Sequence, residues 1–423
     1  MVLERGRQLT ARFACCVLAI YAVLYTLSFP IDRLPGPFIP IANYYARGVY
    51  AVESWVAKGI FGIERPLEFV YHPNGGGDST TDFIRLFCIV VVALTGSAAW
   101  MIAMPSRDPR ALRSYIHVYL RYFLATAMLM YGLAKVTPEG QFYFPRLDYL
   151  IRPLGDLGRS DVLAAFMGSS FAYTLFAGLG ETLGGLLLLS RRTAPLGALV
   201  LIPILLNVLV MNTAYGWDVK IGSAHFLLIA CVLAAPLIQR LLKLVFKDQP
   251  VPPLRVDSPV LALWPRTRFG MKVAMVSWFG WLAIGQIWRL PAQWGDPSKT
   301  AFYGIWDVAA MDVGGDVLSP SLTESRRWRT VVFERNQRVV VRPMSDSLRS
   351  FRATIDTSAR KLRLTRGGDT TSIGAFDFEK PEDGSLILVG TFDALPTRLT
   401  LVPSKRTFRL GACPLRVIVD RFC

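Results

Sequence analysis

Blocks of about 20 mostly apolar residues recur along the first 290 positions of the chain, separated by shorter polar segments. A block of this length crosses the roughly 30 Å hydrocarbon core of a bilayer as an α-helix. The first block follows a basic start, as a secretory signal does, but no small-residue cleavage site follows it, so we favour an uncleaved span. We expect seven transmembrane helices, at Arg12–Phe29, Phe83–Met104, Tyr115–Lys135, Ser170–Leu189, Thr193–Ala214, Ser223–Leu242 and Phe269–Leu290.

The pattern changes after about Pro291, where continuous apolar runs stop and short alternating segments begin. Turn signals such as RGGD and PEDG separate the segments. Short strands at spacings of roughly 8–12 residues predict an antiparallel β-barrel or sandwich. The expected strands cover 328–334, 338–344, 348–356, 361–365, 371–378, 385–390, 397–402 and 407–410.

These patterns divide the chain into four expected parts. Residues 1–113 hold two spans with a long external loop, and residues 114–245 hold the next four spans. Residues 246–290 form a cytoplasmic linker with the seventh span, and residues 291–423 form an external β domain.

The loop after the first span contains an amphipathic helix. Tyr45, Val49, Val52, Val56 and Ile60 recur at spacings of three and four, which places them on one helical face. Such a helix lies on the membrane surface or packs on the bundle, and both alternatives fit. Helix-start residues then precede the second span, in DSTT.

Composition supports a membrane protein. The 423 residues are 52% hydrophobic and 18% charged, whereas a soluble protein carries about 25% charge; the mean hydropathy is +0.37. The net charge of +16 does not indicate nucleic acid, because the arginines cluster beside spans in alternate loops. The positive-inside rule then predicts a cytoplasmic N-terminus, an external C-terminal domain and a location in the bacterial inner membrane, with the domain in the periplasm of a Gram-negative host.

Glu181 lies in an otherwise apolar span and needs a partner there. Arg121 lies on one face of the third span, about 9 Å from its cytoplasmic end, and Glu181 lies about 13 Å from the cytoplasmic end of the fourth. We therefore expect an ion pair between Arg121 and Glu181, with a purely structural clamp as the alternative role.

A second polar layer is expected near the outer leaflet, at the ends of several spans. Its residues share a depth and predict a shallow pocket that opens outward. Lysine snorkelling and helix capping are the alternative explanations for Lys135 and His225. The candidate catalytic residues are Lys135, His225 and Tyr131, and the candidate ligand-binding residues are Asn207, Asn212, Trp217 and Asp218.

Cysteine and histidine patterns add little chemistry. Cys413 and Cys423 are the only cysteines of the β domain, and an oxidising periplasm favours a disulfide between them over two unrelated thiols. The spacings typical of zinc sites are absent, as are GxSxG, HExxH and Walker A motifs. The chain has three histidines, and His117 and His225 are predicted near opposite membrane faces, so paired-histidine haem ligation is not expected.

Three stretches together resemble the DoxX-like membrane protein superfamily. They are MYGLAKVTPEGQFYFP, GLGETLGGLLLLSRR and NVLVMNTAYGWDVKIGSAHF, within residues 114–245. The resemblance implies a four-helix membrane core associated with quinone or thiol redox chemistry.

In the β domain, Gly304-Ile305-Trp306 is similar to the Gly-x-Trp that opens lipocalin-like barrels. Arg409 or Arg416 would then stack on the tryptophan. A barrel of this kind either holds a small apolar ligand or is filled by its own side chains.

Three function classes follow, all for a protein whose surroundings are a lipid bilayer. The favoured one is a quinone- or thiol-redox-associated membrane component with a redox partner protein and quinone as the candidate cofactor. The second is an envelope protein that handles a lipid or apolar ligand. The third is a carboxylase-like membrane enzyme with Lys135 as its base.

Overall fold

The computed structural model describes residues 2–27, 38–67, 77–104, 109–137, 140–142, 146–248, 300–335, 337–366 and 372–408, with isolated positions at 250, between 267 and 285, and at 410. Its described part divides into two compact units. The first comprises residues 1–136 and 175–286, and the second comprises residues 137–174 and 287–423.

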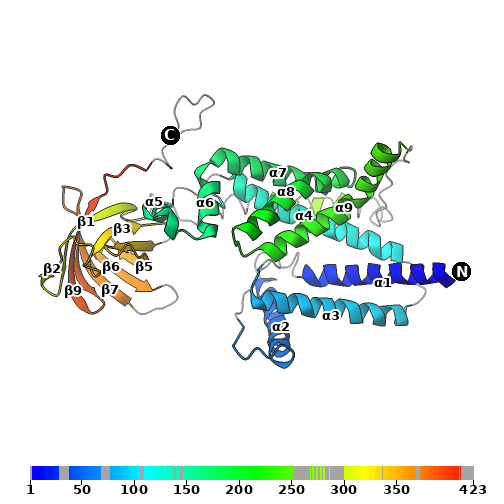
Figure 1. Ribbon diagram of the computed structural model, residues 1–423, viewed down its shortest axis with the longest axis horizontal. Coiled ribbons are helices and arrows are strands. Elements are labelled where there is room, and N and C mark those ends of the chain that lie inside the picture. Colours follow the sequence, from blue (N-terminus) through cyan, green and yellow to red (C-terminus); the bar gives the residue numbers. More distant parts are fainter. Residues whose placement is uncertain are drawn as a thin grey trace. The chain divides into compact units, whose positions relative to one another are not determined.

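The first unit is a bundle of long helices (Figure 1). Its elements are α1 (Val2–Tyr25), α2 (Phe38–Gly59), α3 (Thr80–Ala103), α4 (Pro109–Val136), α7 (Phe171–Leu189), α8 (Ala194–Ala214) and α9 (Lys220–Lys247). Helices α3, α7, α8 and α9 are long and apolar enough to cross a membrane, and the apolar part of α1, Leu9–Tyr25, is shorter. The predicted membrane protein with several spanning-capable helices is therefore confirmed.

The first six predicted spans each coincide with a helix, α1, α3, α4, α7, α8 or α9. The seventh, Phe269–Leu290, lies largely outside the described residues. The predicted start of α3 is confirmed in detail, because Ser79 caps the helix. The Ser79 hydroxyl accepts the Asp82 backbone N–H, and the Asp82 carboxylate accepts the Ser79 backbone N–H at 3.0 Å.

Helix α2 matches the predicted amphipathic helix, but a different face of it is buried. Ala46, Glu53 and Val56 are buried, whereas Tyr45 and Val52 of the predicted stripe are exposed. Val56 joins Ile84 of α3 in an apolar cluster, so the helix packs on the bundle.

The second unit contains a closed antiparallel β-barrel, which is one of the two architectures that the sequence predicts. Its strands are β1 (Gly304–Val313), β2 (Asp316–Val317), β3 (Trp328–Phe333), β4 (Arg338–Pro343), β5 (Arg349–Asp356), β6 (Lys361–Arg366), β7 (Ser372–Glu379), β8 (Leu386–Phe392) and β9 (Leu395–Pro403). Each of β3 to β9 pairs with its sequence neighbour, β1 pairs with β3, and β1 also pairs with β9, which closes the barrel. The last predicted strand is wrong in its described part, since Thr407 and Phe408 are not in a strand.

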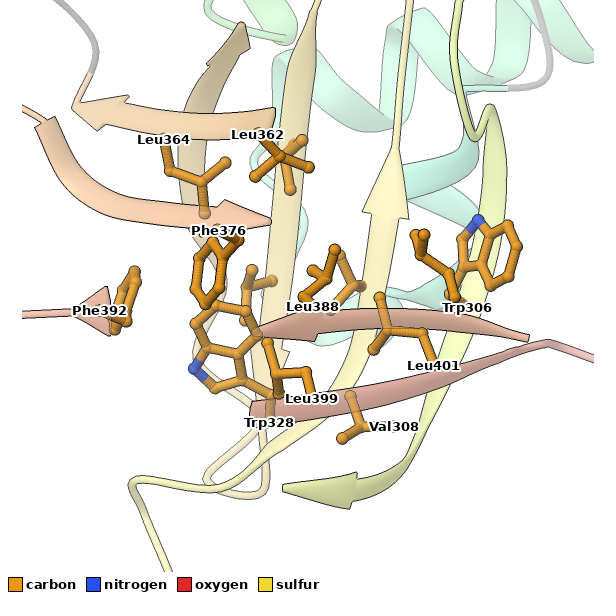
Figure 2. Close-up of a cluster of buried hydrophobic side chains, with 14 of the residues drawn as sticks. Trp306, Val308, Trp328, Leu362, Leu364, Phe376, Leu388, Phe392, Leu399 and Leu401 are labelled. Atoms are coloured by element: carbon orange, nitrogen blue, oxygen red, sulfur yellow. The ribbon is translucent and has the colours of Figure 1, made fainter. Parts of the chain in front are cut away.

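Large apolar side chains pack into the interior of the barrel (Figure 2). On β9, Leu399 and Leu401 point inward and are fully buried, while Arg398 just before Leu399 is exposed and Thr400 between the two leucines is half-buried. The period of two residues along the strand produces this alternation. Trp306, from the predicted Gly-x-Trp, is also buried, and its indole N–H donates to the Phe302 carbonyl at 2.8 Å.

Residues between α4 and α7 belong to the barrel unit, which differs from the predicted continuous core at 114–245. This connector holds α5 (Leu147–Ile151), the 3₁₀ turn η2 (Leu154–Asp156) and α6 (Arg159–Ser169). Leu147 and Ile151 form an apolar cluster with Val332 and Val340 of β3 and β4. The connector therefore covers one outer face of the barrel.

Candidate functional site

A buried ion pair joins α4 to α7. The Lys135 ammonium lies 2.7 Å from each carboxylate oxygen of Glu181. Lys135 is 8% exposed and Glu181 is 3% exposed. Two charges removed from water are tolerated only when each neutralises the other at hydrogen-bonding distance, as here.

Small residues allow the helices to approach closely enough for this pair. A Cβ atom placed on Gly178 would lie 2.7 Å from Cβ of Lys135 and 2.8 Å from the Gly132 carbonyl oxygen. A Cβ atom on Gly132 would lie 2.7 Å from the Thr182 backbone nitrogen. Glycine at both positions therefore removes the side chains that would hold the two backbones apart.

The expected Arg121–Glu181 pair is wrong. Gly132 lies against Gly178 and Thr182, which places Glu181 at the level of Gly132 on α4. Arg121 is eleven residues away along α4, a separation of about 16 Å at 1.5 Å per residue. Its guanidinium donates instead to the Tyr122 hydroxyl at 2.6 Å, while the side chain stays buried.

Tyr131 extends the Lys135 site by one helical turn. The Lys135 ammonium lies 5.8 Å from the centre of the Tyr131 ring, within cation–π range. The same ring contacts Phe226 of α9 edge to face, at 6.0 Å between ring centres. The structure thus brings two of the three predicted catalytic residues together.

His225, the third, lies in a different cluster, with tyrosines of α1. Its ring stacks on Tyr25 at 3.8 Å between centres, and Nε2 lies 2.6 Å from the Tyr21 hydroxyl. Nδ1 lies 2.7 Å from the Ile221 carbonyl oxygen. Tyr21 and Tyr25 share a helical face at a spacing of four, which could have identified them, but the sequence did not show which helix they face.

The predicted ligand-binding residues are scattered. Asn212 is buried and donates to the Ser223 hydroxyl at 3.3 Å. Asn207 and Asp218 are exposed, and Trp217 is half-buried. Asn207 points in a different direction from Asn212, because two residues that are five positions apart lie on different faces of a helix. The single outward pocket expected from shared depth is therefore wrong, and several separate polar contacts take its place.

Asp78, which the sequence analysis named only within the helix-start residues DSTT, caps α9. Its carboxylate accepts the backbone N–H groups of Lys220 and Ile221, both at 2.9 Å, and the Lys220 ammonium at 2.8 Å. Burial opposes the ionisation of Asp78, but these donors together hold its pKa below the ordinary value. The segment before α3 is thereby joined to the start of α9.

A second buried ion pair joins α2 to α3. Arg85 donates from Nε to Oε1 of Glu53 at 2.6 Å, and Glu53 is 1% exposed. Beside the pair lies a groove with a volume of about 380 Å³, formed by α1, α2 and α3. In the sequence, this site could have been recognised from Glu53, which is a charged residue within the apolar pattern of α2.

In the barrel unit, a polar network attaches the connector. Asp148 is fully buried and accepts the guanidinium groups of Arg146 and Arg338, at 3.1 and 3.2 Å. Glu334 accepts the backbone N–H of Asp148 at 3.1 Å. Burial, followed by the negative charge of Asp148, raises the pKa of Glu334 against the effect of neighbouring backbone N–H donors.

Several remaining expectations concern residues outside the described part. Cys413 and Cys423, as well as Arg409 and Arg416, lie there, so the disulfide and the tryptophan-stacking arginine stay predictions. Within the described ranges, no group of three or more His, Cys, Asp or Glu side chains could hold a metal ion.

Comparison with known proteins finds one informative similarity. Over 146 residues the chain is 34% identical to a protein of Bacillus subtilis (strain 168) named "Uncharacterized protein YwoB". The aligned stretch is 34% of this chain and 89% of that protein. No family model matches the chain, and no solved structure matches it. The similarity thus spans nearly all of the relative and about a third of this chain.

Proposed function

This chain belongs to the family of the Bacillus subtilis protein YwoB, and from its four helices that are apolar enough to cross a membrane we propose that it is a multi-pass protein of the bacterial inner membrane. In this proposal the described helices and the seventh predicted span place the N-terminus in the cytoplasm and the β-barrel outside. The alternation of arginine-rich and arginine-poor loops supports this orientation. The order of motifs within residues 114–245 supports a DoxX-like core.

Within that core, we propose a quinone- or thiol-redox-associated function centred on the Lys135–Glu181 pair. The burial of both charges carries the proposal, because ionisable groups inside a membrane bundle are costly and commonly mark functional sites. Lys135 has three N–H donors, and its two contacts with Glu181 leave one for a ligand oxygen. A quinone carbonyl is such an acceptor, and the adjacent Tyr131 ring offers an aromatic surface to a flat headgroup.

The same geometry disfavours the carboxylase-like alternative. A lysine that acts as a base must present its nitrogen to the substrate, whereas the Lys135 nitrogen is held by two contacts at 2.7 Å with one carboxylate. Lys135 is therefore better suited to donate a hydrogen bond than to remove a proton. A redox partner protein would supply or accept the electrons.

The experiment compares single and paired replacements. Lys135→Met or Glu181→Leu alone leaves an unpaired buried charge and is expected to cost about 3–5 kcal/mol of stability. The double variant Lys135→Met/Glu181→Leu keeps the volume without charge, so it is expected to fold and to lose retained quinone. Lys58→Met, at an exposed lysine, is the matched control.

Quinone is measured by mass spectrometry of gently purified protein from the same membranes. A double variant that folds and retains as much quinone as the Lys58→Met control would assign the pair a purely structural role and refute the proposal.

A further inference from the structure

The groove between α1, α2 and α3 is mostly apolar and is separate from the Lys135 site. Its volume of about 380 Å³ lies within the range of ligand pockets, roughly 300–1,000 Å³. Besides Tyr45 and Gly48 of α2 and the Glu53–Arg85 pair, the lining is apolar or weakly polar, from Leu24, Val49, Val52, Cys88, Ile89 and Val92.

Polarity changes along the groove in one direction. Arg85 is the sixth residue of α3, near the helix start that Ser79 caps. Val92 lies seven residues further along, about 10 Å deeper at 1.5 Å per residue. One end of the groove therefore carries charge and the other end is hydrocarbon, which matches the polarity of a lipid that spans from headgroup level into the bilayer.

Exposed aromatic residues place α2 at headgroup level. Tyr44 is 75% exposed and Trp55 is 70% exposed, and Phe61 just after the helix is also exposed. Tyrosine and tryptophan are enriched at membrane–water interfaces, where their rings are partly apolar and partly polar. In Figure 1, α2 lies beside one end of α3 while α1 runs along α3, which fits an interfacial helix next to a spanning one.

The charged end of the groove offers hydrogen-bond donors. Arg85 uses Nε and one terminal nitrogen for Glu53, and its other terminal nitrogen lies 3.7 Å from Asp82. A guanidinium has five N–H donors, so these contacts do not exhaust it. The side chain is 22% exposed, whereas Glu53 is almost completely covered. Arginine matches phosphate and ester oxygens in both charge and geometry.

We propose that this groove binds a glycerophospholipid of the bilayer. One acyl chain lies along Leu24, Cys88, Ile89 and Val92, and a phosphate or ester oxygen accepts a hydrogen bond from Arg85. This site is independent of the Lys135–Glu181 pair and of the redox role proposed for it. It gives the bundle a resident lipid between its first three helices.

Gly48 provides the variant that fills the groove. It lines the groove, and a Cβ atom there would meet nothing within 4 Å, so the backbone accepts a side chain. Gly59, on the same helix, also has nothing within 4 Å and does not belong to the lining. Gly48→Trp and Gly59→Trp are therefore a matched pair, differing in whether the new ring occupies the groove.

The full chain is reconstituted into nanodiscs of phosphatidylethanolamine and phosphatidylglycerol, extracted gently and analysed by native mass spectrometry. Wild type and Gly59→Trp are expected to retain phospholipid. Gly48→Trp is expected to retain about tenfold less, since losing contact with about two buried methylenes changes a binding constant by that factor. Equal retention by the two variants, or selective loss of quinone in place of phospholipid, would overturn the proposal.

Cys88 supplies a second measurement on the unaltered protein, so a folding defect in a variant cannot obscure the result. Cys88 lines the groove, and its alkylation by N-ethylmaleimide is followed by peptide mass spectrometry before and after delipidation. Delipidation is expected to speed alkylation at Cys88, and restoring the phospholipid is expected to slow it again. An alkylation rate that does not depend on phospholipid contradicts a bound acyl chain.

Discussion

Gly178 on α7 is the position at which one added methyl group tests the helix packing most directly. In Gly178→Ala the new Cβ would lie 2.7 Å from Cβ of Lys135, 2.8 Å from the Gly132 carbonyl oxygen and 3.0 Å from a methyl group of Val136. Two of these neighbours are fixed to the α4 backbone. The methyl group is therefore accommodated only if the two helices move apart.

Two effects of opposite sign set the magnitude. Alanine is intrinsically better than glycine in a helix, by about 1 kcal/mol. Overpacking a close interface costs roughly 1–3 kcal/mol, and rigid backbone neighbours place Gly178 at the upper end of that range. We expect a net destabilisation of about 2 kcal/mol for Gly178→Ala. Gly48→Ala, which meets nothing within 4 Å, should show only the helix gain of about 1 kcal/mol.

The assay is unfolding of the full chain by titration with SDS in mixed micelles, followed by circular dichroism. The two alanine variants should differ by about 3 kcal/mol, with Gly178→Ala the less stable. If Gly178→Ala were as stable as Gly48→Ala, α4 and α7 would not be in the close contact that positions the Lys135–Glu181 pair, and the register argument against Arg121 would fail with it.

Three further outcomes are expected. In the barrel, Leu388→Ala should cost about 2–5 kcal/mol in a thermal unfolding scan, while Val389→Ala on the opposite, exposed face of the same strand should cost under 1 kcal/mol. The pKa of Glu334 is higher in the folded protein than in the unfolded chain, so its contribution to folding stability is present at low pH and is lost as pH rises through the folded pKa. The resistance of Glu334→Gln to limited proteolysis should therefore change less with pH across that range than the resistance of the wild type. Since Lys135 and His225 lie in different clusters, Lys135→Met and His225→Phe should have additive effects on unfolding, within about 0.5 kcal/mol in a double-mutant cycle, and a larger coupling would contradict their separation.

Properties that depend on neighbouring residues could be predicted from the sequence. The apolar blocks located six helices, and the helix-start residues in DSTT located the start of α3, because both signals are contained within one turn or one span. Alternation located β3 to β9 for the same reason. The number and spacing of the strands predicted either a barrel or a sandwich, and the pairing of β1 with β9 shows that the barrel is formed.

Contacts between distant segments could not be predicted in the same way. Arg338 and Asp148 meet across 190 positions of sequence, and neither has a local pattern that names the other. Glu181 illustrates the same limit inside the bundle. Its partner depends on the register between two helices, which Gly132 and Gly178 determine through their lack of a side chain.

The outcome for Glu181 also explains why shared depth did not produce a shared pocket. Depth fixes one coordinate of a side chain, and rotation about the helix axis fixes which neighbour it meets. Lys135 turns toward α7, His225 turns toward α1, and Asn212 turns toward the first turn of α9. Each of these three polar groups thus finds a partner on one neighbouring helix, as the low-dielectric interior favours. The redox role proposed for Lys135 and the lipid role proposed for Arg85 therefore belong to different helix pairs and can be tested separately.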